Sequence, residues 1–189
     1  MFLFFDTETT GLPKNWKAPL EDLGNWPRLV QLGWLLTDEN GKELRSVNRI
    51  IKPEGFIIPE AAASVHGITT EQAKNEGESL DEVLDRFVRV VEEAKALVAH
   101  NMSFDEMIMG AELLRKKIDH SMPQRPRICT MRYATDYCAI ETSYGYKWPK
   151  LIELHYKLFG KGFAGAHDAL ADVRATARCF FELIDRKVI

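Results

Sequence analysis

The feature that most constrains the fold of this sequence is a short, wholly apolar run, Phe2 to Phe5, which ends directly in the acidic sequence Asp6-Thr-Glu8. Such runs are typical of strands that are buried on both faces of a sheet. Two further strand-like segments, Leu29 to Thr37 and Glu43 to Ile51, are separated by Asp38-Glu-Asn-Gly41, which favours a hairpin turn. We therefore predict an N-terminal unit of three antiparallel strands.

The rest of the chain alternates predicted helices and strands. Apolar residues recur three and four positions apart between Leu80 and Val91, which is the pattern of an amphipathic helix. The predicted helices are Pro59 to Val65, Leu80 to Ala94, Phe104 to Lys117, Met131 to Ala139, Lys150 to Phe159 and Asp168 to Ile184, and the predicted strands are Ala96 to Ala99 and Ile128 to Cys129. This order favours an α/β fold with a sheet of mixed direction.

The composition is that of an ordinary globular protein. With 189 residues, 46% of them hydrophobic and 28% charged, we expect residues 1–189 to form a single domain whose core needs no disulfide. No apolar run approaches the roughly 20 residues that span a bilayer, so we expect no membrane association. The three cysteines are odd in number and not closely spaced, which favours reduced thiols and a cytoplasmic location.

The acidic sequence after the first strand is a candidate metal site. Residues i and i+2 of a strand point to the same face, so the carboxylates of Asp6 and Glu8 can reach one point in space. Two such carboxylates repel each other unless a cation lies between them. Oxygen ligands suit hard ions such as Mg²⁺ or Mn²⁺. The alternative is a solvated turn, because Asp-x-Glu sequences are common.

Two further acidic positions lie where helices are predicted to begin. Ser103 is the expected N-cap of one helix, which places Asp105 in its first turn, and a purely capping role for Asp105 is the alternative to a functional one. Asp168 is the expected N-cap of the last helix, with Asp172 in its second turn. His167 then lies just outside the helix, where it is either an exposed loop residue or a group that accepts a proton near neutral pH.

In this order, the motifs resemble those of the DEDDh (DnaQ-like) 3′–5′ exonucleases, a family that includes the proofreading subunit of bacterial DNA polymerase III. The matching sequences are Asp6-Thr-Glu-Thr-Thr-Gly-Leu12, His100-Asn-x-x-Phe104-Asp105 and His167-x-Ala-x-x-Asp172. A related branch carries tyrosine in place of the histidine. No tyrosine lies between His167 and Asp172 here, which indicates the histidine branch. The resemblance covers about residues 1 to 186.

This resemblance implies a ribonuclease-H-like fold, with a five-stranded mixed sheet flanked by helices, and it implies the roles of the site residues. Asp6, Glu8 and Asp172 would hold one Mg²⁺ or Mn²⁺ ion, and Asp6 and Asp105 would hold a second. His167 would deprotonate the attacking water. The positions that surround the terminal nucleotide in similar enzymes are Thr7, Thr9, Thr10, Gly11, Leu12, Val65, His66 and Phe104.

The expected activity is hydrolysis of terminal phosphodiesters at single-stranded or frayed 3′ ends of DNA, releasing nucleoside 5′-monophosphates in DNA replication or repair. Two alternatives are open. RNA 3′-end trimming uses the same chemistry, because the catalytic residues do not select the sugar. A catalytically retired binding or scaffold subunit would usually have lost a carboxylate, and all four are present. A proofreading role would require a separate DNA polymerase subunit as partner.

Two irregular segments are candidates for contact with the substrate. Pro13 to Arg28 contains Trp16 and Trp26, which either extend a stacking platform for single strands or anchor the loop in the core; we prefer the second interpretation. Phe104 either belongs to the core or stacks on a base, and His66-Gly67 alternatively forms a turn. Residues 125–161, which include a second loop from Ile140 to Pro149, carry seven Lys/Arg against three Asp/Glu. This local balance of +4 indicates either a solvated face or a basic surface.

Overall fold

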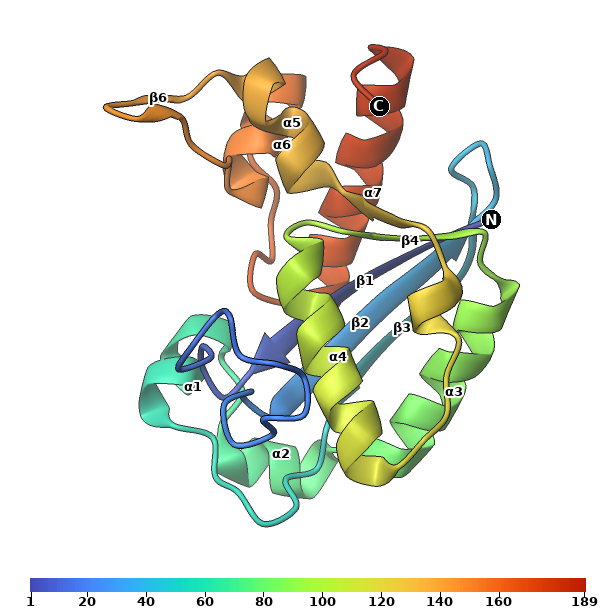
Figure 1. The fold of residues 1–189 in the computed structure, drawn as a ribbon, viewed down its shortest axis with the longest axis vertical. Helices are drawn as coiled ribbons and strands as arrows, with labels where there is room; N and C mark the ends of the chain where they lie inside the picture. Colours follow the sequence, from blue (N-terminus) through green and yellow to red (C-terminus); the bar gives the residue numbers. More distant parts are fainter.

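The computed structural model describes residues 1–189 as an α/β fold around one five-stranded sheet of order β3-β2-β1-β4-β5 (Figure 1). Strands β1 (Phe2–Thr9), β2 (Leu29–Thr37) and β3 (Glu43–Ile50) form the predicted antiparallel unit. Strands β4 (Ala96–Ala99) and β5 (Arg127–Cys129) add to it in parallel. The mixed sheet predicted from the sequence is confirmed.

Helices cover both faces of this sheet. The bounds of the helices are α1 (Glu60–His66), α2 (Thr70–Glu76), α3 (Leu80–Glu93), α4 (Met102–Lys116), α5 (Thr130–Cys138), α6 (Leu151–Phe159) and α7 (Ala169–Asp185). The largest core cluster joins α3 and α4 to one face of the sheet, and a second cluster joins α7 to the opposite face. A third cluster joins α5 and α6 to α7. No helix is both long and apolar enough to cross a membrane.

Side chains of β1 alternate between these two cores. Leu3 and Phe5 pack with α3 and α4, whereas Phe4 packs against Val173 and Phe180 of α7. Because side chains alternate along a strand, Asp6 and Glu8 continue the α7 face and Thr7 continues the α4 face. The acidic end of β1 is thus positioned between the first turns of two helices.

Several details differ from the sequence prediction. Helix α4 begins at Met102 with Asn101 as its N-cap, so the assignment of Ser103 as the cap was wrong. Asn101 adopts a left-handed conformation (φ 76°), which asparagine tolerates better than most residues, and the Ser103 hydroxyl donates to its side chain at 3.2 Å. Asp172 lies in the first turn of α7, one turn earlier than expected.

One α-helix and two short strands were not predicted. Helix α2 was missed because its sequence, TEQAKNE, has only one buried residue, Ala73, and therefore no apolar periodicity. The second predicted loop, Ile140 to Pro149, contains two short antiparallel strands, β6 (Glu141–Thr142) and β7 (Gly145–Tyr146). They form a ribbon that projects from the body at the upper left of Figure 1.

Candidate active site

The close approach of α7 to β2 brings two parts of the site together. Gly33 lies opposite Asp6 in the β1–β2 register. A Cβ atom at Gly33 would lie 2.6 Å from the backbone of Ala169 and Leu170, so only glycine lets the start of α7 pack this closely on the sheet. The sequence held a signal for this contact, because a lone glycine inside an apolar strand often marks close approach of another backbone.

Asp168 fixes the first turn of α7 to the sheet. Its Oδ1 accepts a hydrogen bond from the Ala171 N–H at 3.0 Å, which confirms the predicted N-cap. Its Oδ2 accepts hydrogen bonds from Gln31 Nε2 of β2 at 3.2 Å and from Asn48 Nδ2 of β3 at 2.8 Å. The Ala169 N–H in turn donates to Gln31 Oε1 at 3.0 Å. This network joins two strands to the helix that carries Asp172.

His167 and Asp172 meet Glu8 in front of this helix. His167 lies just outside α7, exposed and with a left-handed backbone (φ 71°), and its N–H donates to Asp172 Oδ2 at 2.9 Å. One potential ligand atom from each of Glu8, His167 and Asp172 lies within 4.8 Å of the others. The structure therefore brings together residues separated by more than 150 positions in the sequence.

Asp105 approaches from the opposite helix. It lies in the first turn of α4, as predicted, and is 2% exposed. The backbone N–H and the hydroxyl of Thr7 both donate to Asp105 Oδ1, at 3.0 and 2.8 Å. These bonds orient Asp105 at the end of β1, and they give buried Thr7 a positioning contact that the sequence did not indicate.

The electrostatics of the four carboxylates show that they share one environment. The pKa of Asp6 is raised well above its ordinary value by burial, and then by the charges of Asp105, Asp172 and Glu8. Burial and the charges of Asp172 and Asp105 raise the pKa of Glu8 to about 8. Burial also raises the pKa of Asp172, although the hydrogen bond from His167 opposes this shift.

The pKa of Asp105 is also raised, but hydrogen bonds to its carboxylate oppose the rise. Burial raises its pKa to about 7, while the two hydrogen bonds from Thr7 favour the charged form and limit the rise. Carboxylates held this close repel each other unless a cation lies between them. A set of four carboxylates with mutually raised pKa values is therefore a suitable site for divalent cations, and the oxygen donors suit hard ions such as Mg²⁺ or Mn²⁺.

A cavity of about 390 Å³ opens onto two of these carboxylates, Asp6 and Asp172, and onto His167. It is lined by Asp6, His100, Lys150, Leu151, Ile152, Phe163, Ala166, His167 and Asp172. Lys150 at the start of α6 is exposed and brings a positive charge to an otherwise acidic site. Lys150, Ile152 and Phe163 were not assigned to the site from the sequence, because their approach depends on how α6 packs.

His100 belongs to the second motif but has no free ring nitrogen. Its Nε2 donates to the Pro149 carbonyl at 2.9 Å, and its Nδ1 accepts from the Thr130 hydroxyl at 2.9 Å. Burial lowers the pKa of His100 to about 4, so the ring is neutral near pH 7. His100 thus joins the wall of the cavity to α5 and to the residue before α6.

The segment after β1, predicted to surround a terminal nucleotide, forms a compact turn. The Thr9 hydroxyl donates to the Gly11 carbonyl at 2.7 Å, and the Thr10 hydroxyl accepts from the Arg28 N–H at 2.9 Å. Gly11 has a φ of 144°, and the side chain of Leu12 is 72% exposed. The turn therefore presents an apolar side chain to solvent beside the acidic end of β1.

The other predicted contact residues lie around this turn. Val65 is 54% exposed at the end of α1. Burial lowers the pKa of His66, and so does the charge of His167, whereas the Thr9 carbonyl raises it. His66 therefore lies near both of these residues. The Ile68 N–H donates to His66 Nδ1 at 3.1 Å, and Gly67 adopts φ 77° as the C-cap of α1, so the predicted turn is also present.

The long connection from Pro13 to Arg28 is anchored to α4. Arg115 donates to the carbonyls of Leu23 and Trp26 at 2.7 and 2.8 Å. Glu112, fully buried, accepts from Arg28 Nε and from the Leu29 N–H, each at 2.9 Å. This buried network holds the loop beside the end of β1.

The two tryptophans of this loop differ in environment. Trp26 is 4% exposed and donates to the Pro19 carbonyl, which is the anchoring role preferred from the sequence. Trp16 is 56% exposed, and its ring centroid lies 5.8 Å from that of Phe104. Phe104 packs against the main core, so it belongs partly to the core and partly to an aromatic pair at the surface.

Comparisons with known proteins agree with this arrangement. Among solved structures, Escherichia coli exonuclease I in complex with a dT13 oligonucleotide is 22% identical, with a TM-score of 0.79 over 98% of this chain and 41% of that chain. A second exonuclease I structure is 20% identical, with a TM-score of 0.79 over 99% and 42%. A zinc-bound form of the E. coli exonuclease I complex with single-stranded DNA is 22% identical, with a TM-score of 0.73 over 98% and 40%.

At these identities the likeness establishes the fold, and the chain spans about two fifths of the length of these exonuclease I chains. No curated protein matched the sequence. A family model described as "Exonuclease" matches residues 3–180, which is nearly the whole chain and includes all five predicted catalytic positions. The resemblance inferred from the motifs is therefore confirmed, and this chain belongs to the DEDDh 3′–5′ exonuclease family.

Proposed function

We propose that this chain is a metal-dependent 3′–5′ exonuclease that hydrolyses the terminal phosphodiester of single-stranded DNA and releases nucleoside 5′-monophosphates. The observation that carries the proposal is the convergence of Asp6, Glu8, Asp105 and Asp172 with His167 at the end of β1. Membership of the exonuclease family supports the reaction class. The intact set of carboxylates argues against a retired enzyme.

Each carboxylate has a proposed part in holding divalent cations. Asp6, Glu8 and Asp172 would hold one Mg²⁺ or Mn²⁺, and Asp6 and Asp105 a second. When bound, such ions stabilise negative charge on the attacking and leaving oxygens of a phosphodiester. Asp6 would contribute to both metal positions. This agrees with its pKa, which the charges of all three other carboxylates raise.

His167 is the proposed general base. The hydrogen bond from its backbone N–H to Asp172 holds the residue at the start of α7, and His167 is exposed and lines the cavity. The ring would take a proton from the attacking water and return it to solvent from its exposed position. Attack on the terminal phosphorus breaks the bond to the 3′ oxygen of the preceding nucleotide, which leaves with a proton as a hydroxyl.

DNA is preferred as substrate because solved structures with this fold contain dT13 and dA16 oligonucleotides. An exposed apolar residue, Leu12, and an exposed aromatic ring, Trp16, stand beside the acidic centre and suit the faces of unpaired bases. The net charge of −3 is compatible with a protein that holds a strand end through local cations and does not coat the strand.

The direct test is incubation with 5′-labelled DNA and RNA strands in the presence of Mg²⁺, Mn²⁺ or a chelator. The expected result is a ladder of shortened DNA, abolished by the chelator and by Asp6→Ala. The released product should comigrate with a nucleoside 5′-monophosphate. Internal cleavage without a ladder, or full activity of Asp6→Ala, would overturn the proposal, and a ladder confined to RNA would replace DNA by RNA as the substrate.

A further inference from the structure

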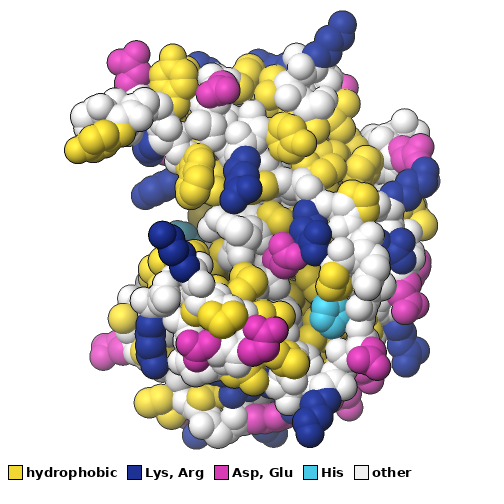
Figure 2. Space-filling model, viewed as in Figure 1, with side chains coloured by type: hydrophobic (Ala, Val, Ile, Leu, Met, Phe, Trp, Pro, Cys, Tyr) yellow, Lys and Arg dark blue, Asp and Glu magenta, His cyan; other side chains and the backbone are white.

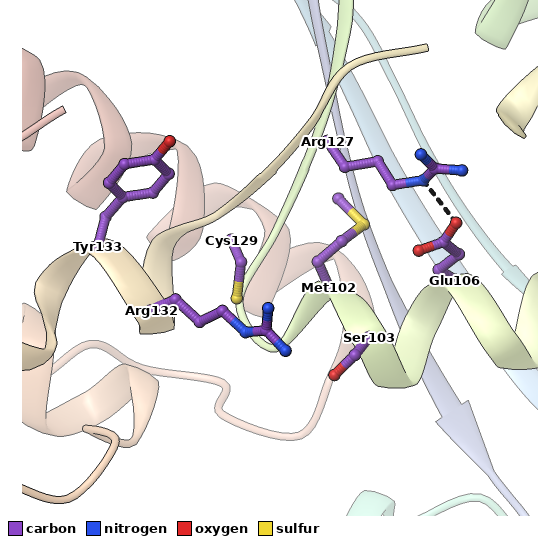
Figure 3. A pocket seen from close by; sticks show the side chains of 7 residues that line it. All are labelled: Met102, Ser103, Glu106, Arg127, Cys129, Arg132 and Tyr133. Atoms are coloured by element: carbon purple, nitrogen blue, oxygen red, sulfur yellow. Dashed lines mark ion pairs between the residues drawn. The ribbon is translucent and has the colours of Figure 1, made fainter. Parts of the chain in front are cut away.

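We propose that a pocket between α4, β5 and α5 binds a nucleotide on the 5′ side of the cleaved end of the strand. This inference rests on the proposed function and extends it from the terminal nucleotide to the strand behind it. The pocket has a volume of about 470 Å³ and is lined by Met102, Ser103, Glu106, Arg127, Cys129, Arg132 and Tyr133 (Figure 3). None of these residues was assigned a function above.

One of the two arginines in the pocket is available to an anionic ligand. Arg127 forms an ion pair with Glu106, with 2.5 Å between Nε and Oε1, so its charge is balanced within the protein. Arg132 is exposed and forms no such pair, and Figure 3 shows its guanidinium extending across the pocket toward the side of Ser103. An unpaired guanidinium offers the fork of donors that suits phosphate oxygens.

Tyr133 supplies an aromatic ring at the edge of the same pocket. Its side chain is 50% exposed, although aromatic residues usually bury most of their surface. It follows Arg132 on α5 and lies at the edge of the pocket in Figure 3. A cation and an exposed ring that line one pocket can bind the phosphate and the base of an unpaired nucleotide.

The pocket adjoins the catalytic cavity through two short segments. His100 lines the catalytic cavity and Met102 lines the pocket, with Asn101 between them. On the facing side, Thr130 bonds to His100 and directly follows Cys129 of the pocket. A strand whose 3′ end occupies the catalytic cavity therefore has this pocket as a neighbouring position for an upstream nucleotide.

The charge distribution favours a nucleic acid as the occupant. The segment that forms β5, α5, the projecting ribbon and α6 has the balance of +4, in a chain whose net charge is −3. On the face drawn in Figure 2, Lys and Arg side chains stand on both sides of the notch below the projecting ribbon. The segment that supplies β5 and α5 to the pocket is thus the positively charged part of the chain, which suits phosphates upstream of the cleaved bond.

The first test measures binding of fluorescein-labelled oligothymidylates by anisotropy in the presence of a chelator, so that no strand is shortened. Arg132→Ala and Tyr133→Ala should each weaken binding of an eight-nucleotide strand about fivefold or more, and should leave unchanged the binding of labelled thymidine 5′-monophosphate, which has no upstream nucleotide. Arg132→Ala should also lower the slope of log Kd against log salt by about 0.7, the value for one phosphate contact on a single strand.

The matched control is Arg89→Ala, which removes an exposed helical arginine from α3, away from the pocket. It should alter neither the affinity nor the salt slope. Melting temperatures of all variants establish that they are folded. Equal affinities of the wild type, Arg132→Ala and Tyr133→Ala for the eight-nucleotide strand would overturn the inference.

A second measurement uses the wild-type protein and the thiol in the pocket. Cys129 is half-buried, whereas Cys138 and Cys179 are buried, so N-ethylmaleimide should modify Cys129 first. A saturating eight-nucleotide strand should slow this modification about fivefold or more, and thymidine 5′-monophosphate should not. An unchanged rate with the longer strand bound would overturn the inference. Absence of any shortening ladder would instead overturn the proposed function, because these two measurements require no hydrolysis.

Discussion

The hydroxyl of Thr7 on β1 donates a 2.8 Å hydrogen bond to Oδ1 of Asp105 on α4, and the Thr7 N–H donates to the same oxygen at 3.0 Å. Thr7 points to the α4 face of the sheet, while its neighbours Asp6 and Glu8 point to the α7 face. One short strand end thereby collects acids from both sides of the sheet. The Thr7–Asp105 contact is what joins the fourth carboxylate to the other three.

Replacement of Thr7 by valine should therefore reduce activity without removing any proposed metal ligand. The variant keeps the backbone bond but loses the hydroxyl bond to a buried carboxylate, a contribution of about 1.5–3 kcal/mol for hydrogen bonds to charged groups. We expect a lower melting temperature and a kcat reduced by about tenfold or more. Thr7→Ser, which restores the hydroxyl, should recover most of the activity, and equal rates for valine and serine would contradict this role.

Asp168 should prove essential for the geometry of the site although it is not a proposed metal ligand. Asp168→Ala removes the N-cap of α7 and leaves Gln31 and Asn48 without their acceptor, so we expect destabilisation of about 1–2 kcal/mol and a fall in kcat. The matched control is Thr69→Ala, which removes the N-cap of α2, a helix that supplies no proposed metal ligand. It should cost about 1 kcal/mol and leave kcat unchanged. Denaturant unfolding and steady-state kinetics on both variants separate the two effects.

The sequence predicted the site residues better than the contacts that place them. Asp6, Glu8, Asp105, His167 and Asp172 stand at element ends, which apolar patterns and turn residues reveal. The contacts of Asp168 with Gln31 and Asn48 join positions more than 100 residues apart, and a single sequence carries no record of such pairings. The cap of α4 was misjudged because serine is the commoner N-cap, whereas the left-handed turn at this junction requires a residue such as Asn101.

Metal-free protein should lose stability as the pH rises. Burial and neighbouring charges raise the pKa of Glu8 to about 8, and burial raises that of Asp105 to about 7, whereas the ordinary values are 4.5 and 3.8. The folded state therefore binds these protons more tightly than the unfolded state. Their stabilising contribution is complete below the ordinary values and is lost as the pH rises through about 7 to 8.

The measurement is the melting temperature in chelator across this pH range, repeated with Mn²⁺. We expect a decline toward alkaline pH in chelator and a smaller decline with Mn²⁺, because the cation stabilises the charged carboxylates. Glu8→Gln should flatten the decline in chelator. A melting temperature that rises between pH 5.5 and pH 8.5 in chelator would contradict the electrostatic coupling of these groups.

Trp16 and Trp26 provide a matched pair for the role of the long loop. Trp16→Ala removes an exposed ring, so it should weaken oligonucleotide binding about fivefold or more and change the melting temperature little. Trp26→Ala removes a buried ring and should destabilise the protein by about 3–5 kcal/mol. Anisotropy and thermal melting distinguish the two outcomes. A large drop in melting temperature for Trp16→Ala, with unaltered binding, would assign Trp16 a structural role instead.

His167→Ala separates two roles that the geometry allows. The atoms of Glu8, His167 and Asp172 are close enough for all three to bind one ion, but the carboxylates alone can also hold an ion beside a free imidazole. If His167 is the general base, the variant should lose about 10²–10⁴-fold in kcat and still bind Mn²⁺ with the affinity of the wild type.

Calorimetric titration with Mn²⁺ measures that affinity, and Glu8→Gln serves as the control that should weaken it. Loss of Mn²⁺ binding in His167→Ala would make the histidine a ligand. The first outcome is favoured because the His167 backbone N–H already donates to Asp172, which holds the residue in place without any bond from the ring. A base fixed through its backbone keeps its imidazole free to accept and release the proton.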